Sequence, residues 1–206
     1  MDDPSLFRTA SRYVRRSRYL NENAWPGTRL RVKWEFLRRD SYITAPFYGP
    51  ILAALREGRL EVGRNVMLLG GCWITVPEGG RARIGAGTHL NLGVFLAAYQ
   101  HVEIGAHCMF ANGCFITDAD HRFDDPHRPI GAQGYEVKGP TVIGDNSWLG
   151  VNVAVLGGVT IGRNCVIGAN SVVNRDIEPF CVAGGVPARV IKRIDPDGAQ
   201  QMGQAL

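Results

Sequence analysis

Histidine is the side chain best suited to move a proton near neutral pH, and His121 is the histidine that the sequence singles out. It ends the stretch "DADH" where a long polar segment begins, and Asp118 and Asp120 lie just before it. Either carboxylate could orient the imidazole ring of a general base, or both could be turn residues. The sequence leaves both interpretations of these aspartates open.

The remaining histidines carry weaker signals. His127 lies in the same polar segment, and we interpret it as a solvated loop residue. His89, His101 and His107 fall at expected strand edges or turns, and no role is assigned to them. His121 is therefore the residue around which the rest of the chain has to be arranged.

The element that must position His121 is a six-residue repeat. An aliphatic or aromatic residue returns every sixth position, with glycine frequent next to it and small or β-branched residues at the fifth position. The repeat positions are Val62, Leu68, Ile74, Ile84, Leu90, Leu96, Ile104, Phe110, Ile116, Ile143, Leu149, Val155, Ile161, Ile167, Val173 and, as the start of a last hexad, Val182. Cys72, Cys108, Cys114 and Cys165 occupy fifth positions, which indicates small core residues.

Six is three times the period of a strand, so each hexad predicts a short strand and a turn with one side chain inward. One such strand buries little by itself, whereas three form a triangular coil and stacked coils bury a continuous column. The sequence therefore predicts a mainly β fold, a parallel β-helix of roughly five coils. Its period does not set its handedness.

The repeat is interrupted three times, by "PEGGRA", by "QHVE" and by a long segment between Ile116 and Ile143. We expect the last to be a protruding loop at 121–140, and long loops on a regular solenoid are candidates for function. The predicted organisation is an N-terminal helical and capping segment at 1–58, the β-helix at 59–187, and a C-terminal segment at 188–206. Within the first segment, 5–20 and 28–39 are expected to be helical, and 42–58 to cap the first coil.

Charge and composition exclude some classes of protein. Residues 1–40 hold ten Lys and Arg against five Asp and Glu, while the rest of the chain is nearly balanced. The body is therefore not a nucleic-acid platform. For the basic N-terminus we favour a solvated helix face over contact with anionic lipid.

The sequence has no apolar run of membrane-spanning length and no signal-peptide pattern, which predicts a cytoplasmic protein. The odd number of cysteines without a CxxC pair predicts neither disulfides nor a metal site.

The stretches "ITDADHRFDDPHRPI", "VIGDNSWLG", "VTIGRNCVIGANSVV" and "VAGGVPARVIKRI" resemble the hexapeptide-repeat acyltransferases, and most of all their maltose/galactoside O-acetyltransferase branch. The resemblance implies a left-handed parallel β-helix, a homotrimer with active sites between subunits, and acetyl-CoA or another acyl-CoA as donor without a metal. It also implies His121 as the catalytic base and Asn91 as a residue that binds the acceptor or steadies the transition state. Tyr99 stands where the family has an acidic acceptor-binding residue, so the acceptor is the least defined substrate.

Coenzyme A is bound by the last coils in this family, where backbone amides meet the pantetheine and basic side chains meet the phosphates. The resemblance places this role on Trp148, Gly150, Val151, Ala169, Asn174, Arg175, Arg189 and Lys192, with Arg193 as a lesser candidate. The alternative for Trp148 is a subunit contact, and for the basic residues a solvated edge. The predicted reaction is acetyl transfer to a hydroxyl of a sugar or saccharide-like acceptor, by direct attack on the thioester.

Three alternatives remain at this point. The acceptor could be a xenobiotic, an antibiotic or an amine. A metal hydratase like the hexapeptide carbonic anhydrases could use His89, His121 and His127 on zinc, although their spacing does not match that family. The solenoid could also be a non-catalytic binding module, which would need neither the His121 loop nor the terminal basic group.

Overall fold

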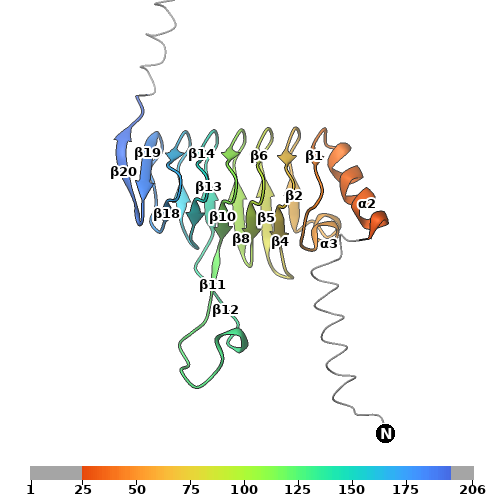
Figure 1. Ribbon diagram of the computed structural model, residues 1–206, viewed down its shortest axis with the longest axis horizontal. Helices are drawn as coiled ribbons and strands as arrows, with labels where there is room; N and C mark the ends of the chain where they lie inside the picture. The colour runs from red at the N-terminus through yellow and green to blue at the C-terminus, as the bar shows by residue number, and fades with distance from the viewer. Residues whose placement is uncertain (1–24, 196–206) are drawn as a thin grey trace, which may run out of the picture.

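The computed structural model describes residues 25–195, which form a left-handed parallel β-helix with three faces (Figure 1). Each coil runs through face 1, face 2 and face 3 in turn, and five complete coils are stacked along the axis. Face 1 consists of β2 (Leu60–Val62), β5 (Arg81–Ile84), β8 (His101–Ile104), β13 (Thr141–Ile143) and β16 (Thr160–Ile161).

Face 2 is the longest sheet. Its parallel strands are β1 (Tyr42–Ile43), β3 (Met67–Leu68), β6 (His89–Leu90), β9 (Met109–Phe110), β14 (Trp148–Leu149), β17 (Val166–Ile167) and β19 (Cys181–Gly185). Face 3 consists of β4 (Trp73–Thr75), β7 (Phe95–Ala97), β10 (Phe115–Thr117), β15 (Ala154–Val155) and β18 (Val172–Val173). The three edges between these faces are where the chain turns and where side chains can leave the solenoid.

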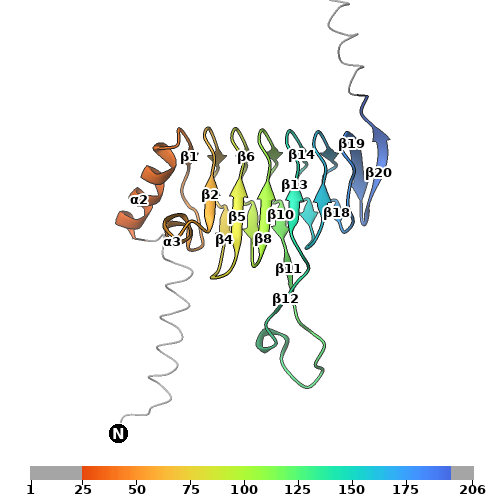
Figure 2. The same ribbon diagram turned by 180° about the vertical axis from the view of Figure 1, so that it is seen from behind.

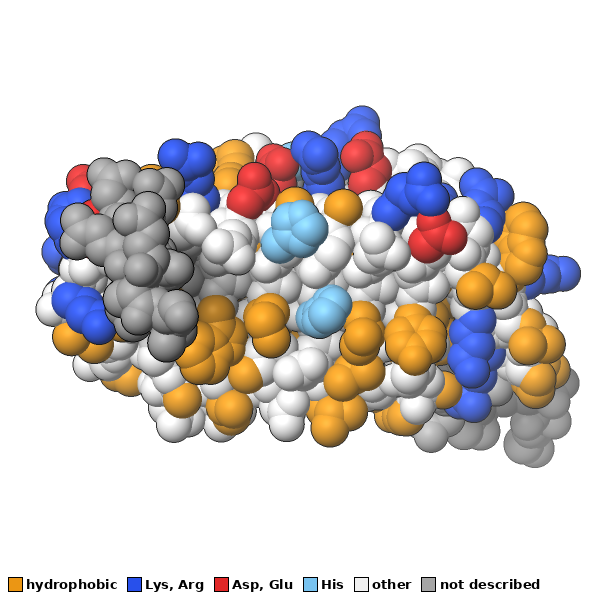
Figure 3. Space-filling model, turned by 90° about the horizontal axis from the view of Figure 1, so that it is seen from above, with side chains coloured by type: hydrophobic (Ala, Val, Ile, Leu, Met, Phe, Trp, Pro, Cys, Tyr) orange, Lys and Arg blue, Asp and Glu red, His pale blue; other side chains and the backbone are white. Residues whose placement is uncertain are grey.

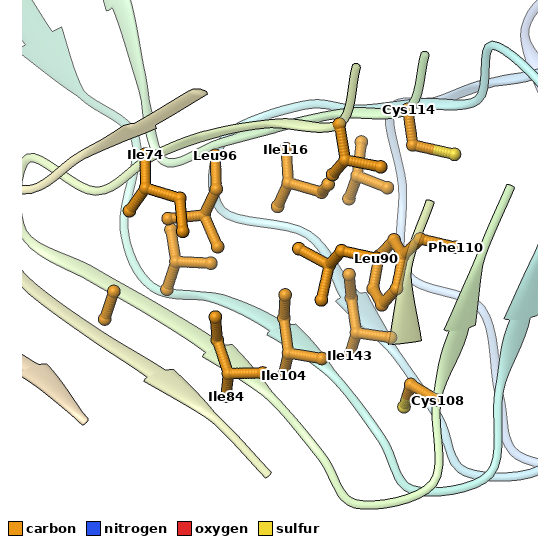
Figure 4. Close-up of a cluster of buried hydrophobic side chains, with 14 of the residues drawn as sticks. Ile74, Ile84, Leu90, Leu96, Ile104, Cys108, Phe110, Cys114, Ile116 and Ile143 are labelled. Atoms are coloured by element: carbon orange, nitrogen blue, oxygen red, sulfur yellow. The ribbon is translucent and has the colours of Figure 1, made fainter. Parts of the chain in front are cut away.

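The predicted inward column is confirmed. Each repeat position from Leu68 to Val173 is at most 1% exposed, and equivalent positions of successive coils pair in register, as Leu90 does with Phe110. Figure 4 shows these side chains meeting in the interior from different faces. Val62 is only partly buried but packs against the same core. The hydrophobic effect acts on this column along the whole solenoid.

The prediction for Val182 is wrong by one residue. After Val173 the next inward residue is Ile177, which bridges to Ile161, and the one after it is Ala183, which pairs with Ile167. The interval between inward residues shortens to four at this point, so the hexad phase moves. Val182 pairs with Val166 on the outer side, and Ala183 is fully buried in its place.

The cysteines are small core residues, as predicted. All five are free and buried, including Cys181. Burial raises the pKa of Cys72 to about 11 and raises the pKa of Cys108, Cys114 and Cys165. Because the thiolate is the nucleophilic form, these side chains are chemically quiet near neutral pH.

The long segment begins and ends as a hairpin outside the three faces (Figure 2). Strand β11 (Ala119–His121) pairs antiparallel with β12 (Tyr135–Val137), and the 3-10 helix η2 (Ile130–Ala132) lies in the loop between them. The hairpin leaves the solenoid after β10, at the edge where face 3 turns into face 1. The protruding loop predicted from the sequence is therefore anchored by two short strands.

The N-terminal end of the solenoid is capped by two helices. Helix α2 (Pro26–Leu37) buries Val32 and Phe36, and α3 (Ile51–Arg56) buries Ile51 and Leu55. Helix α3 falls within the stretch expected to cap the first coil, and α2 overlaps the helix expected at 28–39 but begins and ends two residues earlier. The helix expected at 5–20 lies outside the described residues. No helix between residues 25 and 195 is long and apolar enough to cross a bilayer.

The C-terminal end is closed by β20 (Ala188–Arg193), which turns back antiparallel to β19 along the outer edge of face 2. The stretch "ARVIKRI" thus leaves the last coil as expected, but as a paired strand. It covers the backbone groups that an unpaired end of the sheet would expose.

Candidate active site

His121 lies at the end of β11, opposite Tyr135 of β12. The centroids of the two rings are 4.4 Å apart, and the ring of Tyr99 lies 4.2 Å from Tyr135 on its other side. The imidazole is exposed, which leaves it accessible to a substrate. A tyrosine from each of two segments thus forms a stack that limits the positions available to the His121 ring.

A cavity of about 360 Å³ opens beside this stack, on the outer side of face 3. Its floor is a ladder of aromatic rings from successive coils: Trp73 lies 5.9 Å from Phe95, and Phe95 lies 5.4 Å from Phe115. The complete lining is Trp73, Thr75, Phe95, Ala97, Tyr99, Phe115, Thr117, Ala119, Asp120, His121 and Tyr135. Apolar walls with a few polar groups at one end are typical of a small-molecule site.

Asp118 and Asp120 have different environments, which separates the two interpretations left open above. Asp118 is fully buried, and its carboxylate accepts hydrogen bonds from the backbone N–H groups of Tyr99 (2.7 Å), Gln100 (2.7 Å) and His101 (2.6 Å). Both of its oxygens therefore hold the turn of the preceding coil, which carries Tyr99. Asp120 is exposed and lines the cavity with His121.

Asn91 does not share this cavity. It follows β6 at the edge where face 2 turns into face 3, whereas His121 leaves the opposite edge of face 3. Its backbone N–H donates to Phe110 of the next coil, and its carbonyl oxygen accepts from the Cys72 thiol. Within one chain, face 3 separates the two predicted catalytic residues.

Five of the eight predicted coenzyme-binding residues divide in the same way. Gly150, Val151 and Ala169 lie on the Asn91 edge, where Gly150 is pressed against the next coil. A Cβ at Gly150 would lie 2.7 Å from the backbone nitrogen of Ala169, so only glycine fits. Asn174 and Arg175 follow β18 and lie on the His121 edge. These five predicted coenzyme-binding residues therefore lie on two different edges of the solenoid.

Trp148 and the C-terminal basic residues lie on face 2 or at its end. Trp148 is 52% exposed and pairs in register with Met109 and Val166. Arg189 and Lys192 are exposed on β20, opposite Gly184 and Val182. The lesser candidate Arg193 is already paired with Glu178 at 2.8 Å, and this contact raises its pKa.

The three histidines of the hydratase alternative are not brought together. His89 lies on face 2 and His121 at the end of β11. His127 lies in the loop, where its backbone N–H donates to the carboxylate of Asp125. Among residues 25–195 no three His, Cys, Asp or Glu side chains are placed to share a metal ion.

Sequence reasoning missed Tyr135 and the aromatic ladder. The aromatic residues Trp73, Phe95 and Phe115 each precede an inward residue in every third hexad, the same outward position that Trp148 occupies before Leu149. That recurrence was a signal that could have identified the ladder. Tyr135 has no such signal, because it lies outside the repeat.

Comparisons with known proteins agree with this architecture. A family model described as bacterial transferase hexapeptide (six repeats) matches residues 140–175. Galactoside O-acetyltransferase of Escherichia coli is 35% identical over 145 residues, which cover 68% of this chain and 67% of that protein. The probable acetyltransferase Rv3034c of Mycobacterium tuberculosis is 41% identical over 134 residues, which cover 65% of this chain and 44% of that protein.

Among solved structures, the hexapeptide-repeat containing acetyltransferase VCA0836 of Vibrio cholerae, complexed with acetyl coenzyme A, aligns with a TM-score of 0.53. It is 29% identical, and the alignment covers 70% of this chain and 76% of that one. The chain belongs to the hexapeptide-repeat acyltransferase family. It spans about half the length of the first curated relatives it matches, 44% of one and 55% of another.

Proposed function

We propose that this protein is an acyl-CoA-dependent O-acetyltransferase that acts on a hydroxyl of a sugar or saccharide-like acceptor. The observation that carries the proposal is the position of His121, the one ring in the cavity lining that can take a proton near neutral pH. Family membership adds the donor, because a relative of the same fold was solved with acetyl coenzyme A.

In the proposed reaction a ring nitrogen of His121 takes the proton of the acceptor hydroxyl as its oxygen attacks the thioester carbonyl carbon. The tetrahedral intermediate collapses with cleavage of the C–S bond, the acetyl group stays on the acceptor oxygen, and the coenzyme A sulfur leaves with the proton held by His121. Each cysteine is buried, and the four whose pKa is raised by burial are poor nucleophiles, so transfer is direct.

We further propose that a complete site needs two copies of the chain. His121 and Asn91 lie on opposite edges of face 3, and five of the eight donor-binding candidates follow the same division. A cyclic homotrimer that brings the His121 edge of one copy to the Asn91 edge of the next would join the two half-sites. Asn91 would then reach the acceptor or the oxyanion from across the interface.

Coenzyme A would lie along this joint between the last coils. Gly150, Val151 and Ala169 supply backbone at one edge, and Asn174 at the other. Arg175, Arg189 and Lys192 would meet the phosphates, since all three are exposed near the C-terminal end. Trp148 would pack on the pantetheine or on the neighbouring copy.

The acceptor class follows from the cavity. Its floor of Trp73, Phe95 and Phe115 offers flat apolar rings that suit the apolar side of a sugar ring, and Asp120 and Tyr99 add polar groups to its lining. The relative that acetylates galactosides supports this class. The family's acidic acceptor residue is replaced by Tyr99, so we expect a preference different from that of galactoside enzymes. An amine or an aromatic xenobiotic is the second candidate acceptor, because the same rings would hold it.

The test combines calorimetry with a thiol-release assay on the full chain. Acetyl-CoA should bind with micromolar affinity, and the double variant Arg175→Ala, Arg189→Ala should weaken binding at least tenfold, whereas Arg83→Ala on face 1 should not. With an accepted sugar, His121→Ala should lower the release of coenzyme A roughly 100-fold or more with unchanged donor binding. His127→Ala, on the same loop, is the matched control. A folded protein that does not bind acetyl-CoA would overturn the proposal.

A further inference from the structure

The outer surface of α2 is unusual for the end of a solenoid. Terminal caps of repeat proteins normally present a polar outer face, because nothing stacks on it. Here Val32 and Phe36 face the solenoid and are buried, while Leu30, Trp34 and Leu37 on the opposite side are 68%, 57% and 70% exposed. These three residues are spaced i, i+4 and i+7, so they form one apolar stripe on the helix. Within the described residues, the Arg38 guanidinium lies 5.2 Å from the centroid of the Trp34 ring, and all three side chains of the stripe remain more than half exposed.

Cationic side chains flank this stripe. Arg31 and Arg38, seven residues apart, lie along one side and Lys33 along the other, all of them exposed. Glu35 is the sole acidic residue of α2, and Arg38 and Arg39 already pair with it at 3.4 Å and 2.7 Å. Figure 3 shows hydrophobic and Lys or Arg side chains interspersed at the end of the solenoid that carries α2.

The apolar surface continues beyond the helix. Leu37 and Lys33 line a hollow of about 400 Å³ together with Tyr42 of β1, and Tyr42 is itself 52% exposed. A cation at the rim of an apolar hollow suits a ligand with an acidic head and a hydrocarbon body. The combination of Trp and Leu on one stripe with Arg and Lys on both sides is that of helices which lie in a membrane interface.

We propose that α2 docks this protein on an anionic lipid surface, with Leu30, Trp34 and Leu37 entering the headgroup region and the flanking cations meeting lipid phosphates. Charge argues against the other occupants. Residues 1–24 carry five Arg against three acidic residues, so they have the same sign as the flanks of α2. A second copy of α2 would likewise bring cation against cation. This docking is independent of the proposed acetyl transfer, since none of its residues lines the cavity beside His121.

The experiment is co-sedimentation of the full chain with vesicles of phosphatidylcholine alone or mixed with phosphatidylglycerol. The mixed vesicles should bind the chain at least tenfold more strongly. The apolar variant Leu30→Ser, Trp34→Ser and the charge variant Arg31→Glu, Lys33→Glu should each lower that binding at least tenfold. Phe123→Ser, Ile130→Ser is the matched control, because it removes two equally exposed apolar side chains from the loop. Since all six positions are exposed, these variants should fold.

Several results would overturn the proposal. One is equal binding to both kinds of vesicle, or no binding to either. Another is unchanged binding by both α2 variants while Arg12→Glu, Arg15→Glu, Arg16→Glu abolishes it, which would assign lipid contact to residues 1–24. A change of oligomeric state in Leu30→Ser, Trp34→Ser with unchanged lipid binding would assign the stripe to a second copy. Capture of an acidic protein in place of lipid would likewise contradict it.

Discussion

Among the polar residues near the site, Asp118 should be the one whose substitution lowers the stability of the fold most. Its buried carboxylate accepts three backbone N–H groups, at 2.6 to 2.7 Å, from the turn that carries Tyr99. Its own backbone oxygen accepts from the N–H of Lys138, where the chain returns from the hairpin. Removing the carboxylate should therefore loosen both the turn and the base of the hairpin that holds His121.

The magnitude follows from the hydrogen bonds. One oxygen accepts from Tyr99 and the other from Gln100 and His101. Asp118→Asn can keep the doubly used oxygen but must turn an NH₂ group toward the Tyr99 N–H. It loses one charge-assisted bond, which costs about 2 kcal/mol, whereas Asp118→Ala leaves three donors unpaired and costs about 4 to 6 kcal/mol.

Chemical denaturation of the full chain measures these free energies of unfolding. The exposed neighbour serves as control, and Asp120→Asn should change stability by about 0.5 kcal/mol or less. Thermal melting should follow, with a decrease of about 4 to 8 °C for Asp118→Asn. An Asp118→Ala protein as stable as wild type, or equal losses of stability for Asp118→Asn and Asp118→Ala, would refute this role of the Asp118 hydrogen bonds.

Three further predictions concern other parts of the molecule. The pKa of the Cys72 thiol in the folded protein, about 11, lies above the ordinary value of 9.0. As the pH rises, this thiol therefore ionises first in the unfolded chain, and the free energy of unfolding should fall between pH 9 and 11. Between pH 8 and 10 the free energy of unfolding of Cys72→Ala should fall by about 1.4 kcal/mol less than that of the wild type. An equal decrease in both proteins would contradict this. Gly150→Ala should cost about 2 to 3 kcal/mol in denaturation, because its Cβ meets backbone of the next coil, whereas Gly131→Ala, with open space around it, should cost almost nothing. The Tyr135 ring positions His121, so Tyr135→Ala should lower kcat for acetyl transfer about tenfold with little change in the KM for acetyl-CoA. Tyr135→Phe keeps the ring and should restore kcat. An unchanged kcat in Tyr135→Ala would show that Tyr135 has no role in the site.

The solenoid could be predicted from the sequence because each inward residue is set locally. A large apolar side chain every sixth residue has one way to be buried, and Ile143 to Val173 all follow it. The prediction failed at Val182 because the chain there skips two residues of the repeat and then turns back, with a register shift between Val182 and Ala183. The larger Val182 was assigned as the inward residue, whereas the small Ala183 is the buried one.

The site was less predictable because its contacts cross coils. The role of Asp118 depends on three N–H groups seventeen to nineteen residues earlier in the chain, and neighbouring letters do not reveal such partners. Tyr135 meets His121 only because the hairpin closes. Asn91 and His121 lie on different edges because they occupy turns between different pairs of faces. The sequence alone did not show which turn lies at which edge.

Subunit complementation tests the central claim, a site shared between two chains, most directly. His121→Ala and Asn91→Ala chains, each with its own affinity tag, are co-expressed, and trimers that contain both are purified through both tags. In such a trimer one of the three interfaces would join an intact His121 to an intact Asn91. We therefore expect about one third of the wild-type acetyl-transfer rate, while each variant alone is nearly inactive. Mixed trimers as inactive as the single variants would contradict it.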